Sequence, residues 1–167
     1  MLSQIRQQIA VFIYPEMVDE RRTLERFANV DPLTGLANRR AFDLARPAAD
    51  LDPLTAVVIF DANDFGKVNK QFGQTSGDAA LRVLADSLRD AADAFGFGER
   101  VFRIGGDEFV ALIPKANAEA IRDAAETLRI DYPGGLTVTV SGTIGDNLAE
   151  AENQLQGRKA ARKGNAK

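Results

Sequence analysis

The chain has 167 residues, is 45% hydrophobic and 27% charged, and carries a formal net charge of −3, as expected for an ordinary globular domain with one core. This small negative charge gives no general attraction to nucleic acid or to an anionic membrane, so a phosphate-bearing ligand must be bound by local groups. There is no cysteine and no histidine, which excludes disulfides, thiolate metal sites and imidazole catalysis. Chemistry is left to carboxylates, lysine, arginine, hydroxyls and hard metal ions held by oxygen.

Residues 1–30 are predicted to be helical in two pieces separated by Pro15, because apolar residues such as Ile5 and Ile9 recur at helical spacing. The segment is too short to establish a sustained heptad. It therefore fits equally a helix packed on its own domain and a stalk that dimerises or binds a regulatory partner. No apolar run reaches the roughly 18 residues that a bilayer span needs, and no clear signal-peptide cleavage site is present, so we expect a cytoplasmic protein.

A turn, a helix and a strand are predicted next. The dipeptide Asp-Pro at 31–32 opens a turn, and Asn38 is expected to cap a helix over residues 39 to about 46. The run "LTAVVIFDAND" at 54–64 is continuously apolar and ends in acids. This pattern is typical of a buried central strand whose carboxyl end opens on a site.

The rest of the chain alternates between helices and strands. The expected elements are a short helix or turn at 64–73, an amphipathic helix at 76–95, strands at 100–104 and 109–113 joined by the turn "GGDE", a helix at 117–130, a strand at 135–142 and a helix with a basic end at 147–163. Mixed alternation with one antiparallel hairpin predicts an α+β domain, in which helices pack on a largely antiparallel sheet.

Acidic residues from two of these segments are expected to meet. If the first strand and the hairpin are neighbours, Asp61 faces the turn that carries Asp107 and Glu108. Three carboxylates brought together require a cation or a shifted pKa, and oxygen ligands favour Mg²⁺ or Mn²⁺. Gly105 and Gly106 leave room for a phosphate to approach the backbone. The combination suggests phosphoryl or nucleotidyl transfer, although a Gly-Gly-Asp-Glu turn by itself is most often a hairpin with solvated acids.

Three sequence blocks resemble a known family. "DPLTGLANRRAF" at 31–42, "DANDFGKVNKQFGQTSGDAAL" at 61–81 and "RIGGDEF" at 103–109 are similar to the signature blocks of the GGDEF-domain family, the diguanylate cyclases. The resemblance covers residues 29–165. It implies a palm-like, ferredoxin-like nucleotide cyclase fold with a central, largely antiparallel five-stranded sheet surrounded by helices. The chain then divides into a helical segment at 1–30 and a catalytic domain at 31–167.

The resemblance also implies an activity and its residues. Members of the family join two GTP molecules into cyclic di-GMP and release pyrophosphate, as homodimers in which each domain holds one GTP and two Mg²⁺ (or Mn²⁺) ions. By position, the metal ligands would be Asp61, the carbonyl of Ala62, Asp107 and Glu108, and the last two would assist deprotonation of the 3′-hydroxyl. The GTP-binding residues would be Lys67, Asn69, Asp78, Leu81, Gly105, Gly106, Lys159 and Lys163.

The two polar residues assigned to the base have a chemical rationale. A carboxylate at Asp78 can accept from N1 and N2 of guanine, a donor pair that adenine does not have, and the amide of Asn69 can address O6 or N3. Each also has a structural alternative. Asp78 can simply favour the helix dipole, Asn69 can form a turn or cap, and Lys159 and Lys163 can lie on a solvated basic helix end.

Some positions depart from the family pattern. Gly66 stands where a lysine is usual, although Lys67 follows, and Lys163 replaces an arginine and so loses its bidentate fork. Gly96 and Glu99 stand where an inhibitory Arg-x-x-Asp product site would have its arginine and aspartate, so weak or absent product inhibition is expected. The leading hypothesis is an active diguanylate cyclase. The main alternative is a degenerate module that binds GTP or a cyclic dinucleotide without catalysis, followed by a cyclase of altered base choice and a scaffold.

Overall fold

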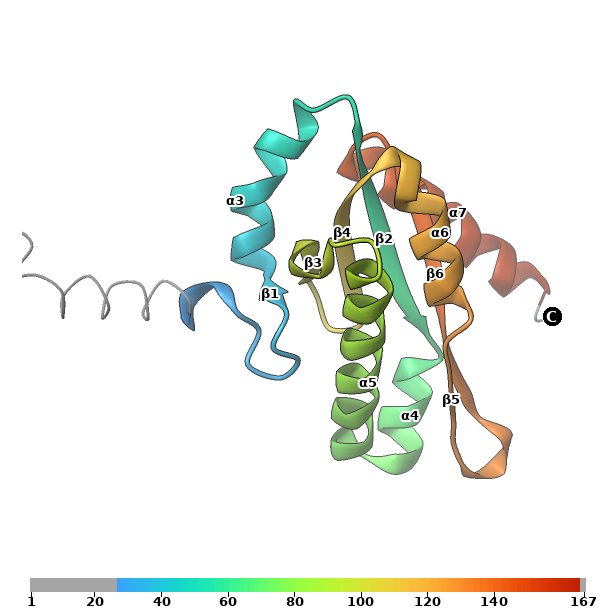
Figure 1. Cartoon of the computed structure of the whole chain (residues 1–167). Coiled ribbons are helices and arrows are strands. Elements are labelled where there is room, and N and C mark those ends of the chain that lie inside the picture. The colour runs from blue at the N-terminus through green and yellow to red at the C-terminus, as the bar shows by residue number, and fades with distance from the viewer. Residues whose placement is uncertain (1–26, 166–167) are drawn as a thin grey trace, which may run out of the picture.

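The structure is a computed structural model that describes residues 27–165, with side chains to residue 162 (Figure 1). The helical segment predicted for residues 1–30 therefore lies almost entirely outside the described residues. The helices are α3 (Arg39–Asp50), α4 (Phe65–Phe72), α5 (Gln74–Asp93), α6 (Lys115–Glu126) and α7 (Leu148–Asn165), with 3₁₀ turns η1 (Gly98–Arg100) and η2 (Pro133–Gly135). The strands are β1 (Ala37–Asn38), β2 (Thr55–Asn63), β3 (Val101–Arg103), β4 (Glu108–Pro114), β5 (Arg129–Asp131) and β6 (Thr137–Gly145).

These strands form one sheet in the order β1-β3-β4-β2-β6-β5. The β1–β3 pair is parallel and the other pairs are antiparallel, which confirms the predicted α+β fold and its largely antiparallel sheet. The sheet has six strands instead of five. The two edge strands, β1 and β5, have only two and three residues, too few to show a strand pattern in the sequence.

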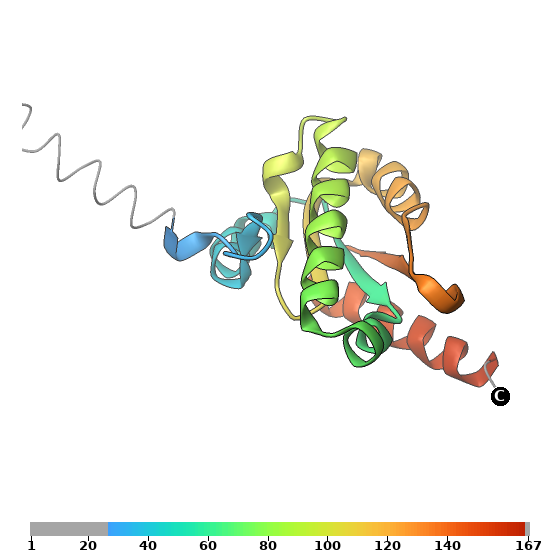
Figure 2. The same ribbon diagram turned by 90° about the horizontal axis from the view of Figure 1, so that it is seen from below.

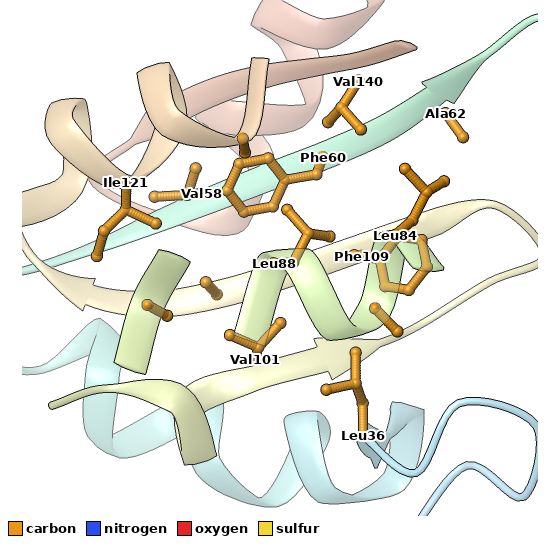
Figure 3. Packing of buried hydrophobic residues seen from close by; sticks show 14 of the residues in the cluster. Leu36, Val58, Phe60, Ala62, Leu84, Leu88, Val101, Phe109, Ile121 and Val140 are labelled. Atoms are coloured by element: carbon orange, nitrogen blue, oxygen red, sulfur yellow. The ribbon is translucent and has the colours of Figure 1, made fainter. Parts of the chain in front are cut away.

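The central strand β2 is buried on both faces, and its side chains alternate between two cores. Val58 and Phe60 pack on the face covered by α5 and α6, and Figure 3 shows them beside Leu84, Leu88 and Ile121. The opposite face carries Val57 and Ile59, with residues of α3 and α7 against them. Figures 1 and 2 show α5 and α7 on opposite sides of the sheet. This two-sided burial explains why the strand reads as an unbroken apolar run.

The helix boundaries correct two predictions. The cap at Asn38 is confirmed, because the amide of Ala41 donates to its Oδ1 at 3.1 Å, but α3 continues to Asp50 with Pro47 inside it. Helix α6 ends at Glu126 instead of residue 130, because residues 129–131 pair with β6 as β5. No helix in residues 27–165 combines the length and apolar character that crossing a bilayer requires.

Candidate active site

The two predicted acidic segments meet at one end of the sheet. In the β2–β4 pairing Asp61 lies directly opposite Glu108, and the amide of Ala62 donates to the carbonyl of Asp107 at 3.2 Å. Asp61 is only 7% exposed. It is an odd-numbered residue of β2, like Val57 and Ile59, so its side chain lies on the face that α7 covers.

Lys159 brings a positive charge to these acids. In α7, Ala151 and Leu155 are buried in the core, and Lys159 is the next residue at the same spacing of four. Its Nζ lies 2.7 Å from Oδ1 of Asp61 and 3.7 Å from Oε1 of Glu108. Burial alone would lower the pKa of Lys159, but the hydrogen bond to Asp61 and the surrounding negative charge outweigh it and raise that pKa. An ammonium ion is therefore held between two carboxylates.

The pKa of Asp107 is affected by its burial and by the neighbouring negative charges. Its pKa is raised, first by burial and then by the neighbouring charge of Asp61. Within residues 27–165 no three acidic side chains lie close enough to hold one metal ion as they stand. The donor set nevertheless suits a hard divalent ion, because it consists of carboxylate and carbonyl oxygens. A cation, the ammonium of Lys159, already lies between Asp61 and Glu108.

A cavity of about 530 Å³ opens beside this cluster. Three of the residues around it, Asn63, Asp64 and Arg162, were not singled out from the sequence. Arg162 follows Lys159 by three residues, which places it on the same side of α7. Asn63 follows Asp61 by two, on the same face of β2, and its Nδ2 donates to the hydroxyls of Thr139 at 3.0 Å and Ser141 at 2.9 Å. The lining residues are Asp61, Ala62, Asn63, Asp64, Lys67, Lys159 and Arg162.

The predicted lysines have different surroundings. Nζ of Lys67 lies 2.8 Å from Oδ1 of Asp64, and its side chain is 69% exposed. Asp64 has a φ of 63°, a left-handed conformation that costs a non-glycine residue about 1–3 kcal/mol and turns the chain sharply from β2 into α4. The side chain of Lys163 lies outside the described residues, so its predicted role stays a prediction.

The turn with the two glycines is held by a long-range ion pair. Nη1 of Arg103 lies 2.9 Å from Oδ1 of Asp31, and Nη2 of the same guanidinium donates to the carbonyl of Gly106 at 2.7 Å. Burial would raise the pKa of Asp31, but hydrogen bonds from Thr34 and Arg103 lower it. The amide of Gly105 is directed at the carbonyl of Glu108 at 3.3 Å. Gly106 faces open space, since a Cβ there would meet nothing within 4 Å.

The residues predicted to bind guanine lie at the corner between α4 and α5, where Gly73 has a φ of +82°. Oδ1 of Asn69 is buried and has no hydrogen-bond partner in the protein. It packs against Gly77, where an added Cβ would lie 1.9 Å from it. An unpaired buried acceptor is costly, and the contact with Gly77 fixes the position of this amide group. Asp78 follows on α5, whereas Leu81 is 2% exposed and belongs to the core, leaving little surface for a base.

The largely antiparallel sheet, with acids at the end of its two central strands, agrees with the nucleotide-cyclase-like α+β fold that the resemblance implies. The chain belongs to the GGDEF family: residues 28–163 match the family described as "Diguanylate cyclase, GGDEF domain". This finding confirms the resemblance read from the three sequence blocks.

Curated relatives agree with the family. The chain is 35% identical over 129 residues to the diguanylate cyclase DgcP of Pseudomonas aeruginosa, covering 74% of this chain and 18% of the relative. It is 30% identical over 143 residues to the diguanylate cyclase DgcM of Escherichia coli, covering 81% and 33%. The chain therefore spans a third or less of the length of these relatives.

Solved structures share the fold. The coiled coil and GGDEF domain of DgcB from Caulobacter crescentus, in complex with c-di-GMP, gives a TM-score of 0.64 at 22% identity, covering 86% of this chain and 82% of that one. The diguanylate cyclase SiaD of Pseudomonas aeruginosa, in complex with its activator SiaC, gives a TM-score of 0.56 at 26% identity, covering 95% and 67%.

Proposed function

We propose that the chain is a diguanylate cyclase, which condenses two GTP molecules into cyclic di-GMP with release of two pyrophosphates. The observation that carries the proposal is the direct cross-strand pairing of Asp61 with Glu108, with Lys159 against both, beside a cavity of suitable size. Membership of the family supports the choice of reaction. In each of two steps a 3′-hydroxyl oxygen attacks the α-phosphorus of the other nucleotide, and a pyrophosphate leaves.

Each residue would contribute a defined function. Asp61, the carbonyl of Ala62, Asp107 and Glu108 would hold divalent ions, Mg²⁺ or Mn²⁺ and two per site, which when bound lower the pKa of the attacking hydroxyl and offset charge on the phosphates. Glu108 would also accept the proton of the 3′-hydroxyl. Lys67, Lys159 and Arg162 would pair with phosphate oxygens.

Base selection would rest on the corner between α4 and α5. The carboxylate of Asp78 would accept from N1 and N2 of guanine, and the amide nitrogen of Asn69 would donate to O6 or N3. Adenine offers no donor pair there. A site that leaves the carboxylate of Asp78 unpaired with the wrong base discriminates against that base.

A homodimer follows from the chemistry of the product. Two identical nucleotides attack each other, so two sites of the same kind must face each other, each loaded with one GTP. Product inhibition through an Arg-x-x-Asp site is not expected, because Gly96 supplies no guanidinium. Its φ of +81° also disfavours any larger side chain at that position.

The test is to incubate the purified chain with GTP and Mg²⁺, beside Glu108→Gln, and to separate the products chromatographically. Glu108→Gln keeps the size and hydrogen bonding of the side chain but removes its charge and basicity. We expect a loss of at least about 100-fold in cyclic di-GMP formation, the scale of one general base. Binding of GTP without product from the parent protein would contradict the proposal and indicate a binding module. Equal product from ATP would contradict the guanine assignment.

A further inference from the structure

We propose that Lys159 is an exchangeable countercation of this site. Its ammonium neutralises Asp61 and Glu108 while no divalent ion is bound, and it transfers to the nucleotide phosphates once an ion takes its place. The inference rests on the proposed function in one respect, since it takes these acids as the metal site. It goes beyond the proposed function in two statements. A metal ion competes with the ammonium of Lys159 for the acids, and a bound nucleotide then binds that ammonium through its phosphates.

The first argument is the charge balance of the strand pair. Asp61 and Glu108 lie directly opposite each other on β2 and β4, and like charges in that position destabilise a sheet. Asp61 is nearly buried, which makes an uncompensated charge there more costly. Nζ of Lys159 reaches both carboxylates, at 2.7 and 3.7 Å, and so performs the electrostatic role of a metal ion.

The second argument is that the side chain of Lys159 has room to adopt another conformation once its ion pairs are broken. Its side chain is 34% exposed, and its stem is flexible with a single point charge at the end. The backbone is anchored one turn earlier by Leu155, which is 3% exposed in the core. The ammonium can therefore swing within the cavity while the helix stays in place.

The third argument is that the displaced ammonium of Lys159 can contact a phosphate group within the same cavity. Lys67 and Arg162 line the same cavity, so a phosphate group bound there would lie near two positively charged side chains. A divalent ion between Asp61 and Glu108 would repel the ammonium from its present position. The displaced ammonium would then bind the phosphate group together with Lys67 and Arg162. Metal and nucleotide would accordingly reinforce each other's binding through this one side chain.

The test measures Mn²⁺ binding to nucleotide-free protein by electron paramagnetic resonance, which requires no catalysis. Lys159→Gln removes the competing cation, so its affinity for Mn²⁺ should rise about tenfold, since nearby charges of this kind interact strongly in a partly buried site. Lys159→Arg keeps the charge and should remain within about twofold of the parent protein. Arg162→Gln is the matched control: it removes one positive charge from the same cavity, and its effect should be a small fraction of that of Lys159→Gln, because screening weakens interactions at longer range.

A second measurement distinguishes exchange from simple metal competition. With saturating Mg²⁺, Lys159→Gln should bind GTP about tenfold more weakly than the parent protein but guanosine equally well, as expected for one lost charged contact to phosphate. An unchanged or weaker Mn²⁺ affinity in Lys159→Gln would overturn the inference, and so would an absence of Mn²⁺ binding in both proteins. If the parent protein makes no cyclic di-GMP but Lys159→Gln still binds Mn²⁺ more tightly than the parent does, this inference is supported. That result would refute only the proposed function.

Discussion

Replacing Gly77 with alanine should displace Asn69 and weaken guanine nucleotide binding while the domain stays folded. A Cβ at position 77 would lie 1.9 Å from Oδ1 and 2.9 Å from Cγ of Asn69, and 3.2 Å from Cε2 of Phe65. In real proteins a Cβ essentially never lies closer than 3.0 Å to a heavy atom of a residue that is not its neighbour in the chain. The amide of Asn69 must therefore leave its buried position.

The effects on stability and on binding differ in size. Alanine is favoured over glycine inside a helix by about 1 kcal/mol, while crowding costs about 1–3 kcal/mol, so the net loss of stability should stay below about 2 kcal/mol. A hydrogen bond to the base that is lost or left unpaired costs about 1–3 kcal/mol. That corresponds to a decrease of about 5- to 150-fold in GTP affinity.

The measurement is a calorimetric titration with GTP and Mg²⁺, together with thermal unfolding of each variant. Gly157→Ala is the matched control, because it makes the same chemical change in α7, where a Cβ would meet nothing within 4 Å. Asn69→Ala should weaken binding to a similar extent, and the double variant Gly77→Ala with Asn69→Ala should be no worse than Asn69→Ala alone. If Gly77→Ala binds GTP like the parent protein, Gly77 does not position Asn69 for the base and the reasoning is wrong.

Two further predictions concern the ion pair behind the glycine turn and the product site. Asp31→Asn should lower the free energy of unfolding by about 1–3 kcal/mol at neutral pH. Because the folded pKa of Asp31 is depressed below 3.8, that stabilisation is present above pH 3.8 and lost as pH falls through the folded pKa. In urea titrations the difference in stability between the two proteins should shrink as the pH falls below 3.8, and a constant difference would contradict the assignment. Cyclic di-GMP added at low micromolar concentration should leave the initial rate unchanged, because Gly96 offers no guanidinium. If cyclic di-GMP inhibits the parent protein and a Glu99→Ala variant is not inhibited, a product-inhibition site does exist at this surface and the prediction is wrong.

Local sequence patterns are enough to predict several parts of this protein. The unbroken apolar run before Asp61 identified a strand buried on both faces, because such a strand has no solvated side on which polar residues could alternate. The lack of cysteine and histidine restricted any metal site to oxygen ligands. Asn38 was identified as a cap because a side-chain acceptor there satisfies a free helix amide, which the structure confirms.

Which distant residues contact each other depends on how the helices and strands pack. Arg103 contacts Asp31 across 72 positions, and Lys159 contacts Asp61 across an even longer separation. Such contacts depend on the order of the strands and on where α7 docks, and neither follows from the spacing of residues along the chain. The short edge strand β5 likewise forms because β6 offers it hydrogen bonds. Local periodicity fixes which face of an element is apolar, but the partner of each polar side chain is set by packing between elements.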